Sequence, residues 1–274
     1  MAGMADTLSI GAHVDQADPI GAAIERGASL SQFFLGDPQG YKGPEFEYDG
    51  GPDALRQAAV EHGIDLYVHA PYIINVATTN NRIRIPSRKL LQQHVDAAAA
   101  IGAKGLIVHG GHVDKAGDDA ELLEKGFDNW RKAVEATDLK LPVLIENTAG
   151  GTNAMTRYLD RIGRVWDAIS HAEGADMVGF CLDTCHAHAG GNDLATVVEK
   201  ARAITGRIDL VHANDSRDAF DSGADRHTNF GQGTIDPDEL VAVVRDAKAP
   251  VVCETPGGAA GHKADFAWLR ERLG

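Results

Sequence analysis

The chain has 274 residues, 43% of them hydrophobic, and a formal net charge of −14. This composition suits a large folded core and disfavours a nucleic-acid-binding surface, unless bound cations reverse the local field. Three cysteines, no signal-peptide pattern in MAGMADTLS and no apolar run long enough for a membrane span argue against a secreted or membrane protein and predict a cytoplasmic one.

Short apolar runs alternate with helical patterns along the chain. Most of the runs are apolar through their middle, as is typical of parallel strands covered on both faces. Strands are predicted over residues 8–14, 30–35, 65–70, 105–110, 142–147, 177–183, 208–215 and 250–255. Among the helices, residues 121–135 place apolar side chains at three- and four-residue spacing, and residues 88–103 end near Gly102, which suits a helix terminus.

Eight strands with eight helical segments predict a (β/α)8 TIM barrel, an α/β fold, in a single domain over residues 1–274. An open doubly wound sheet is the alternative. It is disfavoured because no GxGxxG turn follows the first strand. We expect the domain to be monomeric.

A histidine or carboxylate stands at or just after the C-terminal end of each of the last six predicted strands. The set is His69, His109, Glu146, Asp183, His186, His212, Asp225, His227 and Glu254. These strand ends share one face of a barrel, the face that carries active sites. Burying so many ionisable groups needs compensating cations, and the set exceeds one tetrahedral zinc site. We therefore predict a cluster of two or three ions whose positive field attracts phosphate.

Seven segments resemble the signature blocks of the endonuclease IV family, class II apurinic/apyrimidinic (AP) endonucleases with a TIM barrel and a trinuclear zinc site. They are HAPYIINVA (69–77), IVHGGH (107–112), IENTAGG (145–151), CLDTCHAHAGG (181–191), VHANDSRD (211–218), DRHTNFGQG (225–233) and CETP (253–256). The resemblance covers nearly the whole chain, and LDTCH followed by DRHxxxGxG is its most specific part.

This resemblance implies three zinc ions per chain, with Mn²⁺ or Fe²⁺ as substitutes. The implied ligands are His69, His109 and Glu146 for one ion, Glu146, Asp183, His212 and Glu254 for a second, and His186, Asp225 and His227 for a third. The implied reaction is hydrolysis of double-stranded DNA 5′ to an abasic site, leaving a 3′-hydroxyl, with removal of 3′-blocking groups. Glu146 and Glu254 are the predicted catalytic residues: one bridges two ions, the other orients or deprotonates water.

DNA contacts are predicted on the loops around this centre. Tyr72 is expected to contact a flipped-out nucleotide, and Asn75 either shares that role or caps its loop. The loop GDPQGYKG, where family members carry an intercalating basic residue, offers Gln39, Tyr41 and Lys42. The predicted phosphate contacts are Arg82, Arg84, Arg88 and Lys89, from a basic segment placed before a helix, and Arg217 and Arg226 beside the metals.

The remaining histidines and the cysteines are expected outside the ligand set. His112 and His13 are predicted to support the ligands or the substrate, although a structural role stays equally open for His13. His188 is a secondary candidate for a chemical role at this centre. Surface positions are expected for His62, His94, His171 and His262, and packing roles for Cys181, Cys185 and Cys253.

Two other functions remain open from the sequence. A barrel isomerase or epimerase acting on small sugars would need one metal and about four ligands. A DNA-binding module could mark lesions without cutting. The nine-residue set and the DRHxxxGxG segment favour the nuclease.

Overall fold

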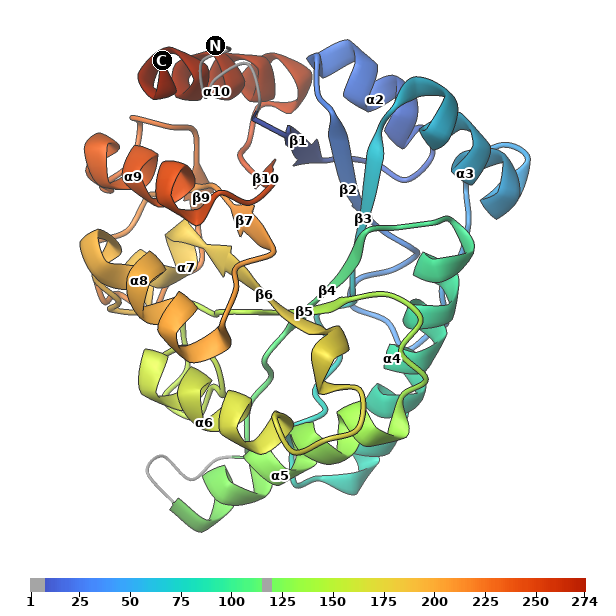
Figure 1. Cartoon of the computed structure of the whole chain (residues 1–274), viewed down its shortest axis with the longest axis vertical. Coiled ribbons are helices and arrows are strands. Elements are labelled where there is room, and N and C mark those ends of the chain that lie inside the picture. The colour runs from blue at the N-terminus through green and yellow to red at the C-terminus, as the bar shows by residue number, and fades with distance from the viewer. Residues whose placement is uncertain (1–7, 115–119) are drawn as a thin grey trace.

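Eight parallel strands form a closed barrel in the computed structural model, which describes residues 8–114 and 120–274 (Figure 1). Around the barrel the order is β1-β10-β7-β6-β5-β4-β3-β2, and pairing of β1 with β10 closes it. The strands are β1 (Ile10–His13), β2 (Leu30–Phe34), β3 (Asp65–His69), β4 (Gly105–His109), β5 (Val143–Glu146), β6 (Val178–Asp183), β7 (Leu210–His212) and β10 (Val251–Cys253). The predicted (β/α)8 barrel is confirmed. Residues 1–7, which carry most of the segment judged not to be a signal peptide, lie outside the described residues.

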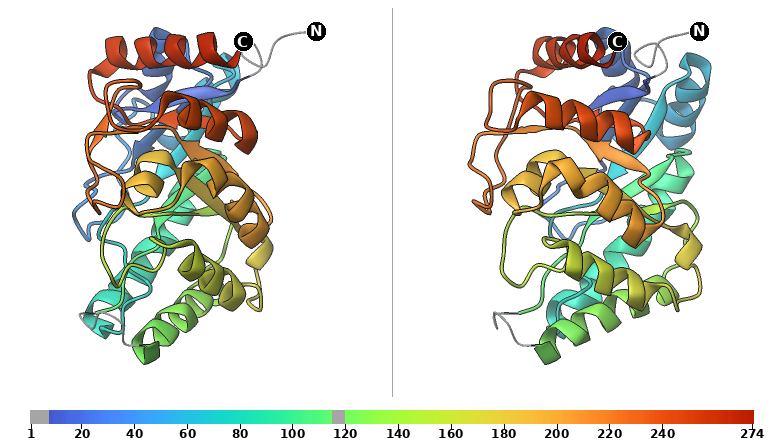
Figure 2. Two further views of the ribbon diagram at one scale, coloured as in Figure 1. Left: turned by 90° about the vertical axis from the view of Figure 1, so that its left-hand side faces the viewer. Right: turned by 60° about the vertical axis from the view of Figure 1, so that its left-hand side comes forward.

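Helices surround the strands, and the longest connecting loops extend to the same side of the barrel, toward the left in both panels of Figure 2. The helices are α2 (Pro19–Arg26), α3 (Gly51–His62), α4 (Asn81–Ala100), α5 (Ala120–Ala136), α6 (Leu159–Ile169), α7 (Thr184–Ala189), α8 (Leu194–Thr205), α9 (Pro237–Ala247) and α10 (Gly258–Leu273). A 3-10 turn, η1 (Ala175–Met177), precedes β6, and a small hairpin, β8 (Asp215–Ser216) with β9 (His227–Thr228), follows β7. Within the described chain, none of the helices combines the length and the hydropathy needed to cross a membrane.

Local signals in the sequence set the helix boundaries. Asp18 caps α2 by accepting a hydrogen bond from the Gly21 N–H at 2.8 Å, and Pro19 occupies the first helical position. At the other end Gly27 adopts a left-handed conformation with φ of 65°, which an L side chain would disfavour. Asp193 caps α8 by accepting a hydrogen bond from the Ala195 N–H at 3.1 Å.

The helix α4 begins at Asn81, earlier than the predicted start at residue 88. The side chain of Asn80 accepts a hydrogen bond from the Arg82 N–H at 3.0 Å and starts the helix there. Pro86 lies inside the helix, where it removes one backbone hydrogen bond without ending the helix. The basic segment predicted to precede a helix therefore forms its first turns.

Two histidines expected on the surface, His94 and His262, are buried instead. His262 is tied into the structure by its ring: Nε2 donates to the Thr255 carbonyl at 2.9 Å, and Nδ1 accepts from Arg26 Nε at 3.0 Å. His94 follows Leu90 and Leu91 by four and three residues, which places it on the buried face of α4. That helical spacing was the signal in the sequence for its burial.

We expect His94→Leu to stabilise the protein more at acidic than at neutral pH. Both ring nitrogens of His94 lack hydrogen-bond partners among the described residues, and burial lowers its pKa to about 4. Because this folded-state pKa lies below the unfolded value of about 6.5, wild-type stability is lost as the pH falls from about 6.5 toward 4. The variant should gain about 2 kcal/mol at pH 5 relative to its gain at pH 7.5.

Urea unfolding at both pH values measures this difference. His62→Gln, on an exposed site of α3, is the control and should leave the pH dependence unchanged. An equal change in the free energy of unfolding of His94→Leu at both pH values would contradict the prediction.

Candidate metal centre

The strand register brings the predicted ligands together at the C-terminal end of the barrel. His109 pairs with Glu146 across β4 and β5, and Asp183 pairs with His212 across β6 and β7. All nine residues fall into three groups, and within each group the candidate ligand atoms lie within 4.8 Å of one another. The groups are His69, His109 and Glu146; Glu146, Asp183, His212 and Glu254; and His186, Asp225 and His227. These are the three sets named from the sequence.

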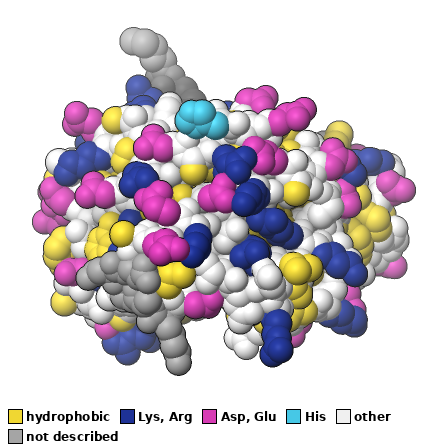
Figure 3. Space-filling view, turned by 90° about the horizontal axis from the view of Figure 1, so that it is seen from below, with side chains coloured by type: hydrophobic (Ala, Val, Ile, Leu, Met, Phe, Trp, Pro, Cys, Tyr) yellow, Lys and Arg dark blue, Asp and Glu magenta, His cyan; other side chains and the backbone are white. Residues whose placement is uncertain are grey.

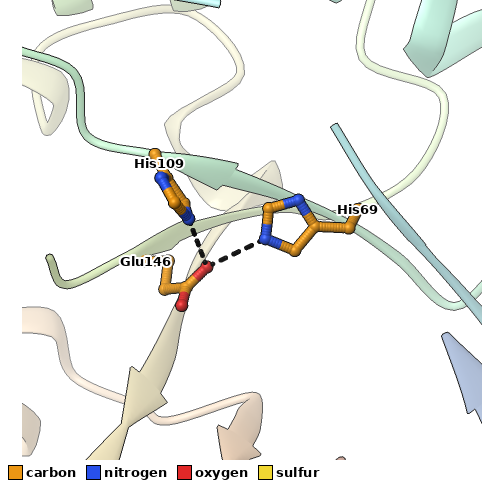
Figure 4. Close-up of side chains that lie close together, drawn as sticks. All are labelled: His69, His109 and Glu146. Carbon is orange, nitrogen blue, oxygen red and sulfur yellow. Dashed lines mark hydrogen bonds and ion pairs between the residues drawn. The ribbon is translucent and has the colours of Figure 1, made fainter. Parts of the chain in front are cut away.

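The first group is built on one carboxylate oxygen of Glu146, as Figure 4 shows. His69 Nε2 lies 3.2 Å and His109 Nε2 3.3 Å from Glu146 Oε2. His69 Nδ1 donates to the carbonyl of Ala70 at 2.8 Å, so its Nε2 carries a lone pair rather than a proton in the neutral ring. Two imidazoles and a buried carboxylate therefore point their ligand atoms at one small volume.

The second group surrounds the other oxygen of Glu146. His212 Nδ1 lies 3.1 Å from Glu146 Oε1, 3.5 Å from Glu254 Oε2 and 3.9 Å from Asp183 Oδ2. His212, Glu146 and Asp183 are fully buried, and Glu254 is only slightly exposed. Since Glu146 belongs to both groups through different oxygens, it is placed to bridge two cations.

The third group gives the clearest test of whether cations fit. The Nε2 atoms of His186 and His227 are buried and, among the described residues, make no hydrogen bond. Each nevertheless lies 3.1 Å from the same oxygen of Asp225. His186 Nδ1 donates to the carbonyl of Asn147 at 3.0 Å, which leaves a lone pair on Nε2 of the neutral ring. Orphaned ring nitrogens converging on a carboxylate fit a bound divalent cation.

The charges of these groups are strongly coupled when the protein holds no metal. Burial alone raises the pKa of Glu146, but His212 and His109 outweigh it and hold that pKa well below its usual range. Burial lowers the pKa of His186, but Asp183 and Asp225 outweigh it and the pKa lies well above its usual range. Protonated histidines thus compensate the buried carboxylates where cations are absent.

The cysteines lie close to the ligands without being needed to complete a group. All three are free and buried, and burial raises the pKa of Cys181 to about 12, which disfavours the thiolate that binds metal. Cys185 does form a fourth cluster of candidate ligand atoms with Asp183 and His227. Both of these neighbours already belong to three-residue or four-residue groups of nitrogen and oxygen atoms.

We expect Cys185→Ser to leave the metal content unchanged and turnover within about threefold of wild type, because the variant loses no nitrogen or oxygen ligand. Elemental analysis of the purified protein, together with its rate of turnover, measures both quantities. Loss of one metal ion per chain from the variant would show that the thiol is a ligand.

A protein-family model described as a xylose isomerase-like TIM barrel matches residues 20–272. A probable endonuclease 4 from Mycobacterium marinum is 53% identical over 266 residues, covering 97% of this chain and 99% of the relative. A probable endonuclease 4 from Mycobacterium tuberculosis is also 53% identical, covering 97% of this chain and all of the relative. The chain belongs to the endonuclease IV family. The prediction of this family, and of an enzyme, is confirmed.

Solved structures show that the fold of the endonuclease IV family is shared more widely. Endonuclease IV from Thermus thermophilus superimposes with a TM-score of 0.79 at 24% identity, covering 96% of this chain and 99% of that one. A D-tagatose 3-epimerase-like protein gives a TM-score of 0.74 at 18% identity, covering 97% and 98%. The barrel alone therefore does not separate the nuclease from the epimerase alternative. The relatives that are 53% identical over 97% of this chain are probable endonucleases 4, which favours the nuclease.

Several polar residues that were not predicted from the sequence support the ligand residues of the metal centre. Asn147 exchanges two hydrogen bonds with the backbone of Asp183, at 2.8 and 2.9 Å. Asn214 donates to Asp183 Oδ2 at 2.7 Å and accepts from the Glu254 N–H at 2.8 Å. Buried Gln32 contacts both His212 and Glu254. Asn147 and Asn214 could have been found because they directly follow or nearly follow ligands at strand ends.

Tyr72 stands at the edge of the centre between two cavities. Its half-exposed ring lies with its centroid 5.4 Å from that of His69 and 5.2 Å from that of His109. It lines one cavity of about 560 Å³, shared with Tyr41 and His109, and another of about 380 Å³, shared with Glu254. Both tyrosines singled out from the sequence therefore border space beside the ligands.

The amide of Asn75 is occupied inside the protein. Its Nδ2 donates to the His112 carbonyl at 2.9 Å, and its Oδ1 accepts from the backbone N–H groups of His112 and Thr78, each at 3.2 Å. Asn75 was predicted either to contact the nucleotide or to cap its loop, and these hydrogen bonds fit the loop cap. The side chain of His112 is exposed and lines the larger cavity, whereas His13 Nδ1 lies 3.5 Å from Glu254 Oε1.

The predicted phosphate contacts on α4 differ in their surroundings. Arg82 and Lys89 are exposed. Arg84 donates to the Thr78 carbonyl at 3.0 Å and to the side chain of Asn81, and Arg88 donates to the Asn129 carbonyl at 3.1 Å. Lys and Arg side chains gather over part of the face in Figure 3, which views the molecule from the end that carries α4, α5 and α6.

The other predicted DNA contacts lie on exposed loops. Arg226 forms a two-point ion pair with Asp218, with its Nε 2.9 Å from Asp218 Oδ2, while Arg217 is exposed. In the loop after β2, Gln39 is exposed and Lys42 pairs with Glu45. His188 is separate from the three groups, and its Nε2 lies 3.2 Å from Thr234 Oγ1.

Proposed function

We propose that this protein is a zinc-dependent AP endonuclease of base excision repair, which hydrolyses the phosphodiester 5′ to an abasic site in double-stranded DNA and leaves a 3′-hydroxyl. The observation that carries the proposal is the convergence of nine ligand residues into three groups at one end of the barrel. The 53% identity to probable endonucleases 4 supports it. We further propose that the enzyme acts as a monomer in the cytoplasm, and that it also removes 3′-blocking groups.

The residues of the three groups would hold three zinc ions, with Mn²⁺ or Fe²⁺ as substitutes. When bound, these ions would supply a water of lowered pKa and stabilise the charge that develops on the scissile phosphate. Glu146 holds two of the groups at a fixed separation through its two oxygens. Glu254 borders the cavity of about 380 Å³ and is positioned to accept a proton from an attacking water.

The cavities beside Tyr72 would receive the extruded abasic sugar. Extrusion costs little free energy at an abasic site because no base has to be unpaired. This low cost contributes to selectivity. The net charge of −14 makes a local basic surface necessary for holding DNA. Arg82, Lys89 and Arg217, which are exposed, are the proposed phosphate contacts.

A nicking assay on a duplex with a single stable abasic-site analogue tests the function. The expected product is a nick 5′ to the analogue whose 3′-hydroxyl a DNA polymerase extends, and elemental analysis should give three zinc ions per chain. An uncut duplex with metal sites saturated would overturn the proposal. A single metal ion per chain would favour the epimerase alternative.

A further inference from the structure

We propose that Gln32 is a positioning residue that decides which ring nitrogen of His212 carries the proton and which oxygen of Glu254 faces the metal centre. Gln32 lies on β2 and is fully buried. Its amide contacts Glu254, His212 and His13, residues that are 222, 180 and 19 positions away along the chain. The inference rests on the proposed metal centre.

The orientation of the Gln32 amide follows from its neighbours. Nε2 donates to Glu254 Oε1 at 2.7 Å, and Oε1 lies 2.8 Å from His212 Nε2. A reversed amide would place two oxygen atoms 2.7 Å apart against a carboxylate, which is repulsive and leaves the buried amide unsatisfied. His212 Nε2 must therefore be the donor to Gln32 Oε1.

A proton on Nε2 leaves the lone pair of neutral His212 on Nδ1. That atom faces the three carboxylates of the second group, at 3.1 Å from Glu146, 3.5 Å from Glu254 and 3.9 Å from Asp183. A lone pair among carboxylate oxygens is favourable only with a cation between them. Gln32 also occupies Oε1 of Glu254, so Oε2 is the oxygen presented to the group.

In the other two groups, a backbone carbonyl decides which ring nitrogen of a histidine carries the proton. His69 donates to the carbonyl of Ala70, and His186 donates to the carbonyl of Asn147. Only for His212, of these three histidines, does a side chain accept the hydrogen bond from the proton-bearing nitrogen. A substitution can therefore remove this support from the second group alone.

The test uses Gln32→Met, which keeps the side-chain length without polar atoms and so removes both the acceptor for His212 and the donor to Glu254. Zinc affinity is measured by competition with a chromogenic chelator. Gln32→Met should retain two zinc ions tightly and bind the third about 10- to 100-fold more weakly. The kcat for abasic-site incision should fall at least about 10-fold with little change in KM.

Ser31→Ala is the matched control, because Ser31 neighbours Gln32 on β2, is also fully buried, and donates to the Pro19 carbonyl at 2.7 Å, away from the ligands. It should alter stability without altering zinc affinity. Wild-type zinc affinity in Gln32→Met, or an equal loss of affinity for all three zinc ions, would overturn the proposal. If wild type binds three zinc ions but leaves abasic DNA uncut, the proposed function fails while the zinc measurements still decide the role of Gln32.

Discussion

Glu146→Gln is expected to abolish DNA incision, lowering kcat by about 10³-fold or more, while the barrel stays folded. Glu146 is the one residue shared by two of the three groups, with Oε2 near His69 and His109 and Oε1 near His212. An amide offers one oxygen and no negative charge. It would turn its NH₂ group toward one of the two groups and could no longer bridge them.

Incision of an abasic duplex and elemental analysis of the same preparation measure this effect. The metal content should fall below three ions per chain, and the far-UV circular dichroism should not change. Glu124→Gln is the control, because Glu124 is exposed and pairs with Arg164 on the outside of the barrel. Incision by Glu146→Gln within 10-fold of wild type, at full metal content, would show that the bridge is misassigned.

The barrel and the ligand groups could be predicted because both depend on local features of the sequence. Each strand is a compact apolar run, and most ligands close or closely follow one, as His109 and Glu146 do. Asp225 and His227 are the exceptions, since they lie beyond β8 in the chain. Parallel strands bring their C-terminal ends to one face, so the position of a residue along its strand is enough to place it. The division into groups came from the family resemblance, and the geometry contains the same groups.

The supporting contacts could not be predicted, because they join residues that are distant in sequence. Gln32 stands in the apolar run LSQFF, and nothing near it shows that its partners lie 180 and 222 residues away. The contacts of loop residues could not be predicted for a related reason. Arg226 is paired with Asp218 in the folded loop, a partner that a count of basic residues does not include.

Removing the metal ions is expected to lower the thermal midpoint by more than about 10 °C at pH 8, because each ion binds the folded state and not the unfolded chain. The buried carboxylates then depend on protonated histidines for compensation. Burial lowers the pKa of His212 and His186, but Cys181 and the carboxylates around His212, and the carboxylates around His186, outweigh burial and raise both pKa values well above 6.5. The stabilisation these histidines give the metal-free protein is complete below pH 6.5 and is lost as the pH rises through the raised pKa values.

The difference in thermal midpoint between the zinc-loaded and metal-free protein should therefore widen between pH 6 and pH 8.5. The affinity for zinc also rises with pH, because zinc binds only histidines that have lost their second proton. This widens the difference further. Below about pH 4.5 the metal-free protein loses stability again, because the lowered pKa of Glu146 reflects stabilisation that disappears on protonation. Thermal melts of metal-free protein, with and without added zinc, measure the difference at each pH. A difference that stays constant from pH 6 to pH 8.5 would mean that the buried histidines do not carry the compensating charge.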